Sequence, residues 1–367
     1  MTGTAPWRAF QSLPFAHGGP PASGRLRATP ADFVVEERLG FAPDGDGEHR
    51  LLRVRKVGAN TEWVARRLAA FAGVPASAVG WAGLKDRHAV TTQWFTVPVT
   101  NRPEPDWAAA GADDDGFRVL EVHRHRRKLR RGALAGNRFQ LRIGSLSGDR
   151  AALHERLARV AEHGVPNYFG EQRFGRGGAN LERASALFEG RPGRVDRHRR
   201  GLWLSAVRAQ LFNEVLAERV IRGDWDRPLA GDRMQLAGSQ SHFAAETIDE
   251  ALCARTRAGD IAPTGPLWGR GAPLTSGTPA QLEGEVAAAF PLWVQGLEAA
   301  GLKHERRALR LTAKDLTWEW RGDDLLELAF ELPAGAYATA VVRELVDWHG
   351  AGLDRDDTAD PPAFDGR

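Results

Sequence analysis

Strand-like and helix-like segments are distributed unevenly along the 367 residues, and this distribution limits the folds that the chain can adopt. Short apolar runs bounded by turn residues, which are typical of strands, dominate the first part of the chain and return near its end. Between them, apolar residues recur at helical spacing. We therefore expect a strand-rich α+β domain built from both ends of the chain, interrupted by a mostly helical insertion.

The expected boundaries follow from the same patterns. The strand-rich domain should comprise residues 1–160 and 308–350, and the insertion residues 161–307. Strands are predicted over 33–39, 51–57, 79–82, 90–97, 117–122, 139–143, 308–312, 316–321 and 325–332. Helices are predicted over 179–188, 202–221, 248–258, 281–300 and 337–348, with two earlier helices that begin at Asn60 or Thr61 and at Asp149. The Gly- and Pro-rich segment 262–279 is expected to be a loop.

Several protein classes are excluded by simple counts. No run approaches the roughly 20 apolar residues that a membrane helix needs, and the N-terminus lacks the apolar core of a secretory signal. We therefore expect a cytoplasmic protein. Cys253 is the only cysteine, so an internal disulfide, a thiolate zinc site and an iron–sulfur cluster are excluded, and we expect no metal.

The formal net charge of +3 averages regions of different character. The residues after Gly350 carry five aspartates, so 351–367 is expected to be an acidic, disordered tail. The remaining chain is more basic, and only five of its cations are lysines. Arginine pairs with phosphate and stacks on bases, although a GC-rich genome also explains its abundance.

Two arginine-rich runs suggest a phosphate backbone as partner. Residues 123–148 contain eight cations and no acid: Arg124, Arg126, Arg127, Lys128, Arg130, Arg131, Arg138 and Arg142. The second run comprises Arg191, Arg194, Arg197, Arg199 and Arg200, relieved only by Asp196. One such run is as often a solvated surface as a binding site, whereas two runs favour nucleic acid. His123 and His125 have no nearby carboxylate or thiolate and are interpreted as part of this surface.

An aspartate between two cations is the first candidate for chemistry. Asp86 lies between Lys85 and Arg87 in a turn that joins two apolar segments. Neighbouring cations favour the ionised carboxylate, which could serve as a nucleophile, a base or a charge stabiliser. A surface ion pair is the commoner role of such a turn. Trp81 before the turn, and the segment 91–94 after it, add flat apolar and hydrogen-bonding groups that suit a base-binding pocket.

A second candidate segment, 166–175, mixes aromatic residues, amides and arginine around glycines. Aromatic rings beside cations hold unstacked bases, while an aromatic structural hinge is nearly as common. Gly175–Gly178 lacks the Lys-Ser/Thr of a phosphate loop, so a nucleoside triphosphate site is excluded.

Five separated motifs occur in an order that matches a known family. They are RATPADFVVEE (27–37), GLKDR with Gln93 (83–93), GNRF (136–139), PNYFGEQRFG (166–175) and PAGAYAT with REL (333–345). On these motifs the chain resembles the TruD family of tRNA pseudouridine synthases over nearly its whole length. The resemblance implies a pseudouridine synthase catalytic domain with a mixed, largely antiparallel sheet. It also identifies the helical segment with the family's additional domain, which would form the other wall of a basic tRNA-binding cleft.

The resemblance also implies roles for individual residues. Asp86 corresponds to the catalytic aspartate of the family, and Phe33, Asn137 and Tyr337 to uridine contacts, where Tyr337 replaces a phenylalanine and adds a hydroxyl that needs a partner. Supporting positions in the matched motifs are Arg27, Lys85, Gln93, Arg138 and Phe139. Arg27 stands where the family often has lysine and is expected to pair with Asp86, without a role in proton transfer.

The implied activity is isomerisation of uridine 13 in the tRNA D-arm, with no cofactor, by a monomer. Whether the aspartate attacks C1′ or removes the C2′ proton stays open. Two other interpretations also stay open: a synthase that modifies a different RNA position, and a non-catalytic RNA-binding or chaperone protein. An intact Asp86 together with Phe33 and Asn137 favours an enzyme, because a purely binding protein has no need to retain them.

Overall fold

The computed structural model describes residues 7–100, 103–111, 116–191, 193 and 195–350; the expected acidic tail lies outside these residues. The chain divides into two compact units. The strand-rich unit contains residues 23–148, 314–335 and the C-terminal residues from 348, and the helix-rich unit contains residues 1–22, 149–313 and 336–347. These units differ from the expected domains mainly because the N-terminal segment and the helices at 150–163 and 338–345 belong to the helix-rich unit. The domain boundaries drawn from the sequence therefore stay a prediction.

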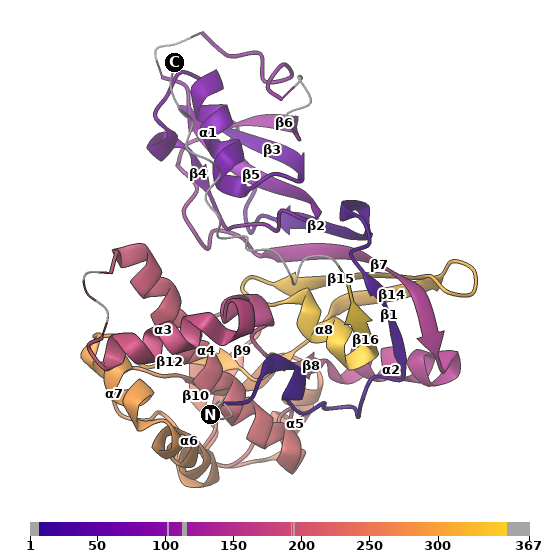
Figure 1. Cartoon of the computed structure of the whole chain (residues 1–367), viewed down its shortest axis with the longest axis vertical. Coiled ribbons are helices and arrows are strands. Elements are labelled where there is room, and N and C mark those ends of the chain that lie inside the picture. Colours follow the sequence, from indigo (N-terminus) through magenta and orange to yellow (C-terminus); the bar gives the residue numbers. More distant parts are fainter. Residues whose placement is uncertain (1–6, 101–102, 112–115, 192, 194, 351–367) are drawn as a thin grey trace. The chain divides into compact units, whose positions relative to one another are not determined.

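The strand-rich unit is organised around one large mixed sheet (Figure 1). The strands of this sheet are β1 (Ala22–Leu26), β2 (Phe33–Arg38), β3 (His49–Val57), β4 (Gly80–Trp81), β5 (Val90–Pro98), β6 (Phe117–His125), β7 (Gly136–Gly148), β14 (Lys314–Trp320), β15 (Leu326–Pro333) and β16 (Val346–His349), which pairs with β1. The main order is β14-β15-β7-β2-β5-β3-β6, with β1 paired to β7 and β4 to β5. Only β2 and β5 are parallel along this path, which confirms a largely antiparallel α+β fold.

Period-two alternation explains how the central strands are buried. In β2, Phe33, Val35 and Glu37 are buried and alternate with more exposed residues. Helix α1 (Thr61–Phe71) packs Val64 and Leu68 into a core with residues of β3 and β5. Gly73, at φ 64°, follows the helix in the left-handed conformation that glycine favours. The helix and the sheet together fix the ends of the strands from which the candidate site is built.

The helix-rich unit is centred on the 26-residue helix α4, which runs from Arg197 to Arg222. Asp196 caps its first turn and Gly223 ends it at φ 70°. The other helices are α2 (Arg150–His163), α3 (Ala179–Phe188), α5 (Glu250–Arg257), α6 (Gly277–Ala289), α7 (Pro291–Ala299) and α8 (Ala338–Leu345). Among the described residues, no helix is both long and apolar enough to cross a membrane.

The helix-rich unit also contains strands that the sequence patterns do not predict. They are β9 (Arg233–Leu236), β10 (His242–Ala244), β11 (Ile261–Leu267) and β12 (Glu305–Ala308), arranged in the order β10-β9-β11-β12, and β8 (Val165–Pro166). The partner of β8 is β13 (Arg310–Leu311), which lies within the predicted strand 308–312. The expected loop 262–279 thus begins with a strand. Its prolines are tolerated because β9 pairs only with residues 261–263 and β12 only with 264–267, so each half of β11 has one ladder partner in this sheet.

Two predicted helices are shorter in the structure. The segment predicted as one helix over 281–300 forms two helices in the structure, α6, which begins earlier at Gly277, and α7. Pro291 begins α7 because a proline would interrupt a continuous helix. The last helix ends at Leu345, and β16 (Val346–His349) follows it. At the start of α1, Asn60 makes no capping hydrogen bond through its side chain. Asp149 caps α2 as expected, since its carboxylate accepts from the Ala152 amide at 3.0 Å.

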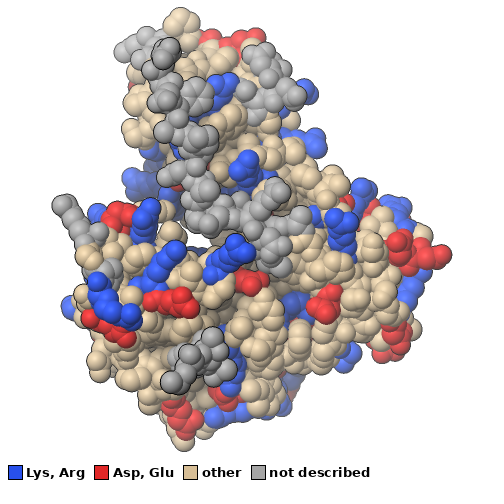
Figure 2. Space-filling model, viewed as in Figure 1, with Lys and Arg blue, Asp and Glu red and all other residues tan. Residues whose placement is uncertain are grey.

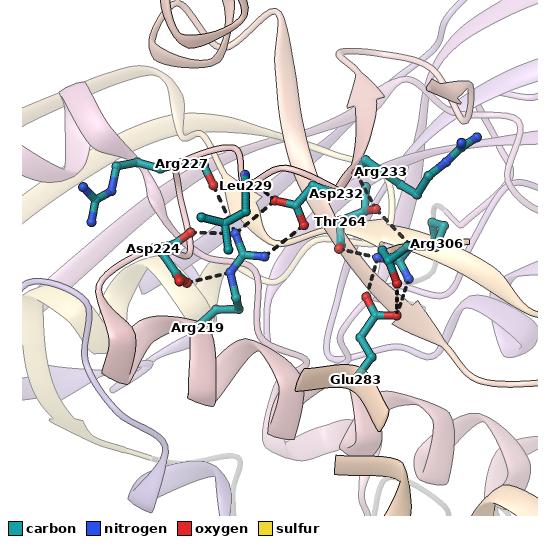
Figure 3. Close-up of polar contacts among 10 residues, drawn as sticks. Arg219, Asp224, Arg227, Leu229, Asp232, Arg233, Thr264, Glu283 and Arg306 are labelled. Carbon is teal, nitrogen blue, oxygen red and sulfur yellow. Dashed lines mark hydrogen bonds and ion pairs between the residues drawn. The ribbon is translucent and has the colours of Figure 1, made fainter. Parts of the chain in front are cut away.

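Buried charges connect the core elements of the helix-rich unit (Figure 3). The Arg219 guanidinium of α4 lies 3.0 Å from Asp232 and 2.6 Å from Asp224. Arg306 of β12 forms a second buried pair with Glu283 of α6 at 2.8 Å. Burial raises the pKa of Asp232, and the neighbouring Arg219 opposes that shift. Each buried charge is therefore compensated by a partner on another element.

This pairing leads to a stability prediction. Replacing Asp232 with alanine removes one of the two carboxylates that face Arg219, and should lower the free energy of unfolding by about 3–5 kcal/mol, as expected for a broken buried pair. Glu250→Ala is the matched control, because the exposed pair of Glu250 with Arg257 should contribute less than about 1 kcal/mol. Urea unfolding followed by circular dichroism measures both changes. Equal, small losses in the two variants would contradict a structural role for the buried pair.

Candidate active site

The candidate site is built on the loop that joins β4 to β5 in the strand-rich unit, and a chain of hydrogen bonds fixes that loop. The buried Thr61 hydroxyl, at the start of α1, accepts from the Lys85 amide at 3.0 Å and donates to Gln93 Oε1 at 2.8 Å. Gln93 Nε2 in turn donates to the Gly83 carbonyl at 3.0 Å. Gln93 is fully buried. Gln93 therefore holds the backbone on the N-terminal side of Asp86 in place through hydrogen bonds.

A buried lysine holds the same loop through its carbonyl groups. Lys56 is only 1% exposed, and its ammonium donates to the carbonyls of Ala59 at 2.7 Å and Asp86 at 3.0 Å, with a longer contact of 3.4 Å to Lys85. These carbonyls match the three donors of an ammonium group. Because a buried charge is costly unless its partners are present, Lys56 and the loop conformation stabilise each other.

The Asp86 carboxylate is oriented by both of its oxygens. Oδ1 accepts from the His88 amide at 3.0 Å, and Oδ2 lies 2.7 Å from Nη1 of Arg27, with the Asp86 side chain 13% exposed. The Arg27 guanidinium also covers the ring of Phe33, with Cζ 3.9 Å from the ring centroid. Arg27 thus contacts both Phe33 and Asp86, and all three residues were singled out in the sequence.

The backbone of Arg27 is itself unusual. Its φ of 61° places a long side chain in the left-handed region, which non-glycine residues seldom adopt. Such strain costs on the order of 1–3 kcal/mol and persists only where surrounding contacts require it. The Arg27 side chain contacts Asp86 and Phe33 in this conformation, so the strain coincides with the candidate site.

Lys85 has a partner on the neighbouring strand. Its ammonium lies 2.7 Å from Glu37 Oε2 in β2, and both side chains are buried. Glu37 Oε1 accepts from the Trp94 amide at 3.2 Å. Through this ion pair, Lys85 anchors the Asp86 loop to β2 of the central sheet.

The GNRF segment of β7 divides between the two faces of the sheet. Asn137 is the register partner of Glu37, so its side chain lies on the same face. Among the described residues, the buried Asn137 Oδ1 has no hydrogen-bond partner. Phe139 is a core residue, with its ring 6.2 Å from Phe33. Arg138 pairs in register with Glu36 and is exposed on the opposite face, so the structure does not bring it to the Asp86 side.

Tyr337 lies in the helix-rich unit, directly before α8. Its hydroxyl accepts from Arg173 Nη2 at 2.8 Å and Nε at 3.1 Å, which supplies the partner that this hydroxyl needs. The ring lies 6.1 Å from Phe169 in an edge arrangement. A Cβ at Gly170 would lie only 3.0 Å from Thr339 and 3.4 Å from the Tyr337 ring. The glycine of the PNYFG motif therefore allows a close approach of the backbone to Tyr337.

A second arginine completes this aromatic cluster. Arg307 lies over the Phe169 ring, with Cζ 4.1 Å from the centroid, and donates to Asn167 Oδ1 at 2.6 Å. Desolvation lowers the pKa of Arg307 to about 10, so the guanidinium stays charged at neutral pH. This desolvated charge orients Asn167 and Phe169, which belong to the aromatic segment singled out in the sequence.

Comparisons with known proteins match the chain along nearly its full length. A family model described as "tRNA pseudouridine synthase D (TruD)" matches residues 11–191 and 180–345. A protein of Methylococcus capsulatus named tRNA pseudouridine synthase D is 49% identical over 352 residues, covering 96% of this chain and 99% of that protein. One of the same name from Nitrosococcus oceani is 52% identical over 334 residues, covering 90% and 93%. The chain belongs to the tRNA pseudouridine synthase D family.

The fold agrees with this assignment. A crystal structure from Methanosarcina mazei, described as a putative tRNA pseudouridine synthase D, superposes with a TM-score of 0.69 at 21% identity. The match covers 91% of this chain and 95% of that one. Among the described residues, no three His, Cys, Asp or Glu side chains gather in a way that could hold a metal ion.

The sequence alone did not indicate a supporting role for some residues of this site. Lys56, Glu37 and Thr61 were not singled out, although a signal for two of them exists. Lys56 continues the inward-facing alternation of Leu52 and Val54, and Glu37 continues that of Phe33 and Val35. A charged residue at an inward-facing strand position needs a partner, and this requirement indicates a buried polar site.

The anchoring role of Lys56 is testable without an activity assay. In Lys56→Met the carbonyls of the Asp86 loop lose their donor, so the amides of Lys85 and His88 should exchange with solvent roughly tenfold faster or more. Hydrogen exchange monitored by mass spectrometry or NMR measures this rate. Lys314→Met, at an exposed position of β14, is the control and should leave it unchanged. Unaltered exchange in Lys56→Met would show that the loop does not depend on this ammonium.

Proposed function

We propose that this chain isomerises uridine 13 in the D-arm of tRNA to pseudouridine, with Asp86 as the essential catalytic carboxylate. The single observation that carries this proposal is the Asp86 carboxylate, held 2.7 Å from the Arg27 guanidinium on a loop that buried residues fix. The names of the relatives supply the substrate class and the reaction. The position in the tRNA rests on the resemblance of the motifs.

The reaction needs a placed carboxylate and a held base. The uridine N1–C1′ bond breaks, the freed uracil turns, and a C5–C1′ bond forms while C5 loses a proton and N1 gains one. The product is therefore an isomer, and no oxidant or reductant is needed. Asp86 acts at the ribose, either as the nucleophile at C1′ or as the base that removes the C2′ proton. Arg27 stabilises the anionic carboxylate of Asp86. It keeps its own proton, because the guanidinium group of arginine does not deprotonate near neutral pH.

The contacts to the base are part of the same proposal. Asn137 Oδ1, unpaired among the described residues, accepts the N3–H of uracil, and the amide group donates to a uracil carbonyl. Phe33 contributes through the Arg27 guanidinium that lies on its ring. Tyr337 provides an aromatic face whose orientation Arg173 fixes. Gln93 and Lys85 position the loop, and Phe139 supports Phe33 from the core.

The protein surface suits an RNA substrate. Figure 2 shows Lys and Arg side chains exposed on both units, with Asp and Glu side chains among them. In the run 123–148 the exposed Arg127, Arg130 and Arg131 form no ion pair with any described carboxylate. In the second run, Arg199 and Arg191 pair with Asp196 and Glu189, and Arg194 lies outside the described residues.

A tRNA substrate is consistent with a protein of the cytoplasm, where we propose that it acts as a monomer without a cofactor.

Mapping pseudouridine in unmodified tRNA tests the proposal. The wild-type protein should convert uridine 13, and Asp86→Asn should be slower by roughly 10³-fold or more, because removing a carboxylate that reacts at the sugar removes the chemical step. Carbodiimide labelling followed by primer extension locates the product. Asp323→Asn, in an exposed turn, is the control and should keep full activity.

Three results would contradict the proposal in different ways. Full activity of Asp86→Asn would remove the catalytic role of this residue. Product at another position alone would indicate a synthase with a different RNA target. Tight tRNA binding by the wild-type protein without any product would indicate an RNA-binding or chaperone protein.

A further inference from the structure

A large pocket of about 1210 Å³ lies in the strand-rich unit, apart from the residues that hold Asp86. Its walls come from β4, the segment that follows β2, the start of β3 and the arginine-rich loop between β6 and β7. Arg27, Phe33, Asp86 and Asn137 do not line it. The pocket is large enough for a nucleotide, and the proposed reaction does not use it.

The arginine-rich loop is rigidly attached to the pocket wall. Its Leu129 amide donates to Thr96 Oγ1 at 2.9 Å, and the Gly132 amide donates to the Ala82 carbonyl at 2.7 Å. Gly80 allows this packing, because a Cβ there would lie 2.6 Å from the Leu129 carbonyl oxygen. The loop therefore presents its side chains from a fixed backbone, and less ordering is needed when they bind a ligand.

The cations of this loop divide into two groups. Arg126 pairs with Asp46, and Lys128 donates to the Ser77 carbonyl at 2.5 Å. Arg127, Arg130 and Arg131 line the pocket, are exposed and form no ion pair with a described carboxylate. The acid that lines the pocket, Asp44, is occupied by His125 and by the Arg126 amide. The pocket thus offers three guanidinium groups that no described carboxylate compensates, and such groups suit a phosphate.

Aromatic and hydrogen-bonding groups lie on the same walls. Phe41 is 39% exposed and stacks on His125, with ring centroids 5.3 Å apart and planes 15° from parallel. His125 is itself held by Asp44 at 2.8 Å. Trp81 Nε1 and His49 Nδ1 have no hydrogen-bond partner among the described residues. Burial lowers the pKa of His49, so its neutral ring offers one donor and one acceptor near pH 7.

We propose that this pocket binds a second, unpaired nucleotide of the RNA substrate, with its phosphate on Arg127, Arg130 and Arg131 and its base against Phe41. The inference rests on the proposed function for the identity of the RNA. Stacking surfaces beside uncompensated arginines are how proteins hold single-stranded nucleotides. The pocket then binds the RNA at a nucleotide other than the one that reacts. This binding helps to offset the free-energy cost of extracting the uridine from a folded arm.

Photocross-linking tests where the RNA lies. A tRNA transcript that contains 4-thiouridine is irradiated in complex with the full-length Asp86→Asn variant, which keeps the pocket and should not turn over. Mass spectrometry should find cross-links in peptides that contain Phe41 or Trp81. Cross-links confined to other peptides would overturn the proposal. Because this measurement needs no product, it stays informative even if the wild-type protein forms no pseudouridine.

Binding measurements test the cations against a matched control. On the same background, Arg130→Ala with Arg131→Ala should raise the Kd for tRNA by about tenfold or more and reduce the salt slope of log affinity by roughly 0.9 for each phosphate that the protein no longer neutralises. Arg66→Ala with Arg118→Ala removes the same charge from exposed positions outside the pocket and should change Kd much less. Equal changes in the two double variants would overturn the proposal.

Phe41 and a free nucleotide complete the test. Phe41→Leu should weaken tRNA binding severalfold without changing the salt slope, because it removes a stacking surface and no charge. Uridine monophosphate at millimolar concentration should not displace the transcript from the Phe41 peptide. A pocket that binds the monophosphate but shows no cross-link to tRNA would assign the site to a free nucleotide and overturn the assignment to RNA.

Discussion

The candidate site depends on a requirement that applies to every folded protein, namely that buried polar groups must have partners. On the buried face of β2, β3 and β5, apolar residues stand beside four buried polar residues, Glu37, Lys56, Thr91 and Gln93. Three of these side chains find their partners in the loop that carries Asp86 or in the residues that hold it. The loop therefore has one conformation that satisfies them, and the carboxylate is positioned by the core beneath it.

A feature of the fold or the site could be predicted from the sequence where the residues that determine it are close together in the chain or belong to a family motif. Local patterns are sufficient for β2, β5 and α3, whose predicted and observed bounds nearly coincide. The family motifs led us to expect the pair of Arg27 with Asp86, and the two side chains lie 2.7 Å apart although they are far apart in the chain. The contact of Arg27 with Phe33 was not expected. The alternation in β3 indicates that Lys56 is buried but does not identify its partners, because two of the carbonyls that it contacts belong to residues about thirty positions away.

Other features were outside the reach of local patterns for a different reason. Strand β11 was expected to be a loop, because Pro263 and Gly265 are unfavourable in an isolated strand, and only the split pairing with β9 and β12 makes them acceptable. The buried pairs of Arg219 and Arg306 in the helix-rich unit look like ordinary surface charges in sequence. Tertiary packing decides which charges are buried, and that information is absent from a single window of residues.

The most direct measurement is the single-turnover rate constant for pseudouridine formation at saturating enzyme, compared between the wild-type protein, Arg27→Met and Arg27→Lys. If the positive charge of Arg27 stabilises the reactive form of the Asp86 carboxylate, the rate constant of Arg27→Met should be lower by roughly 10²-fold. Arg27→Lys should recover most of the rate, and the Kd for tRNA should be nearly the same in all three proteins. A wild-type rate constant in Arg27→Met, or a loss confined to Kd, would contradict the role of this ion pair in the reaction.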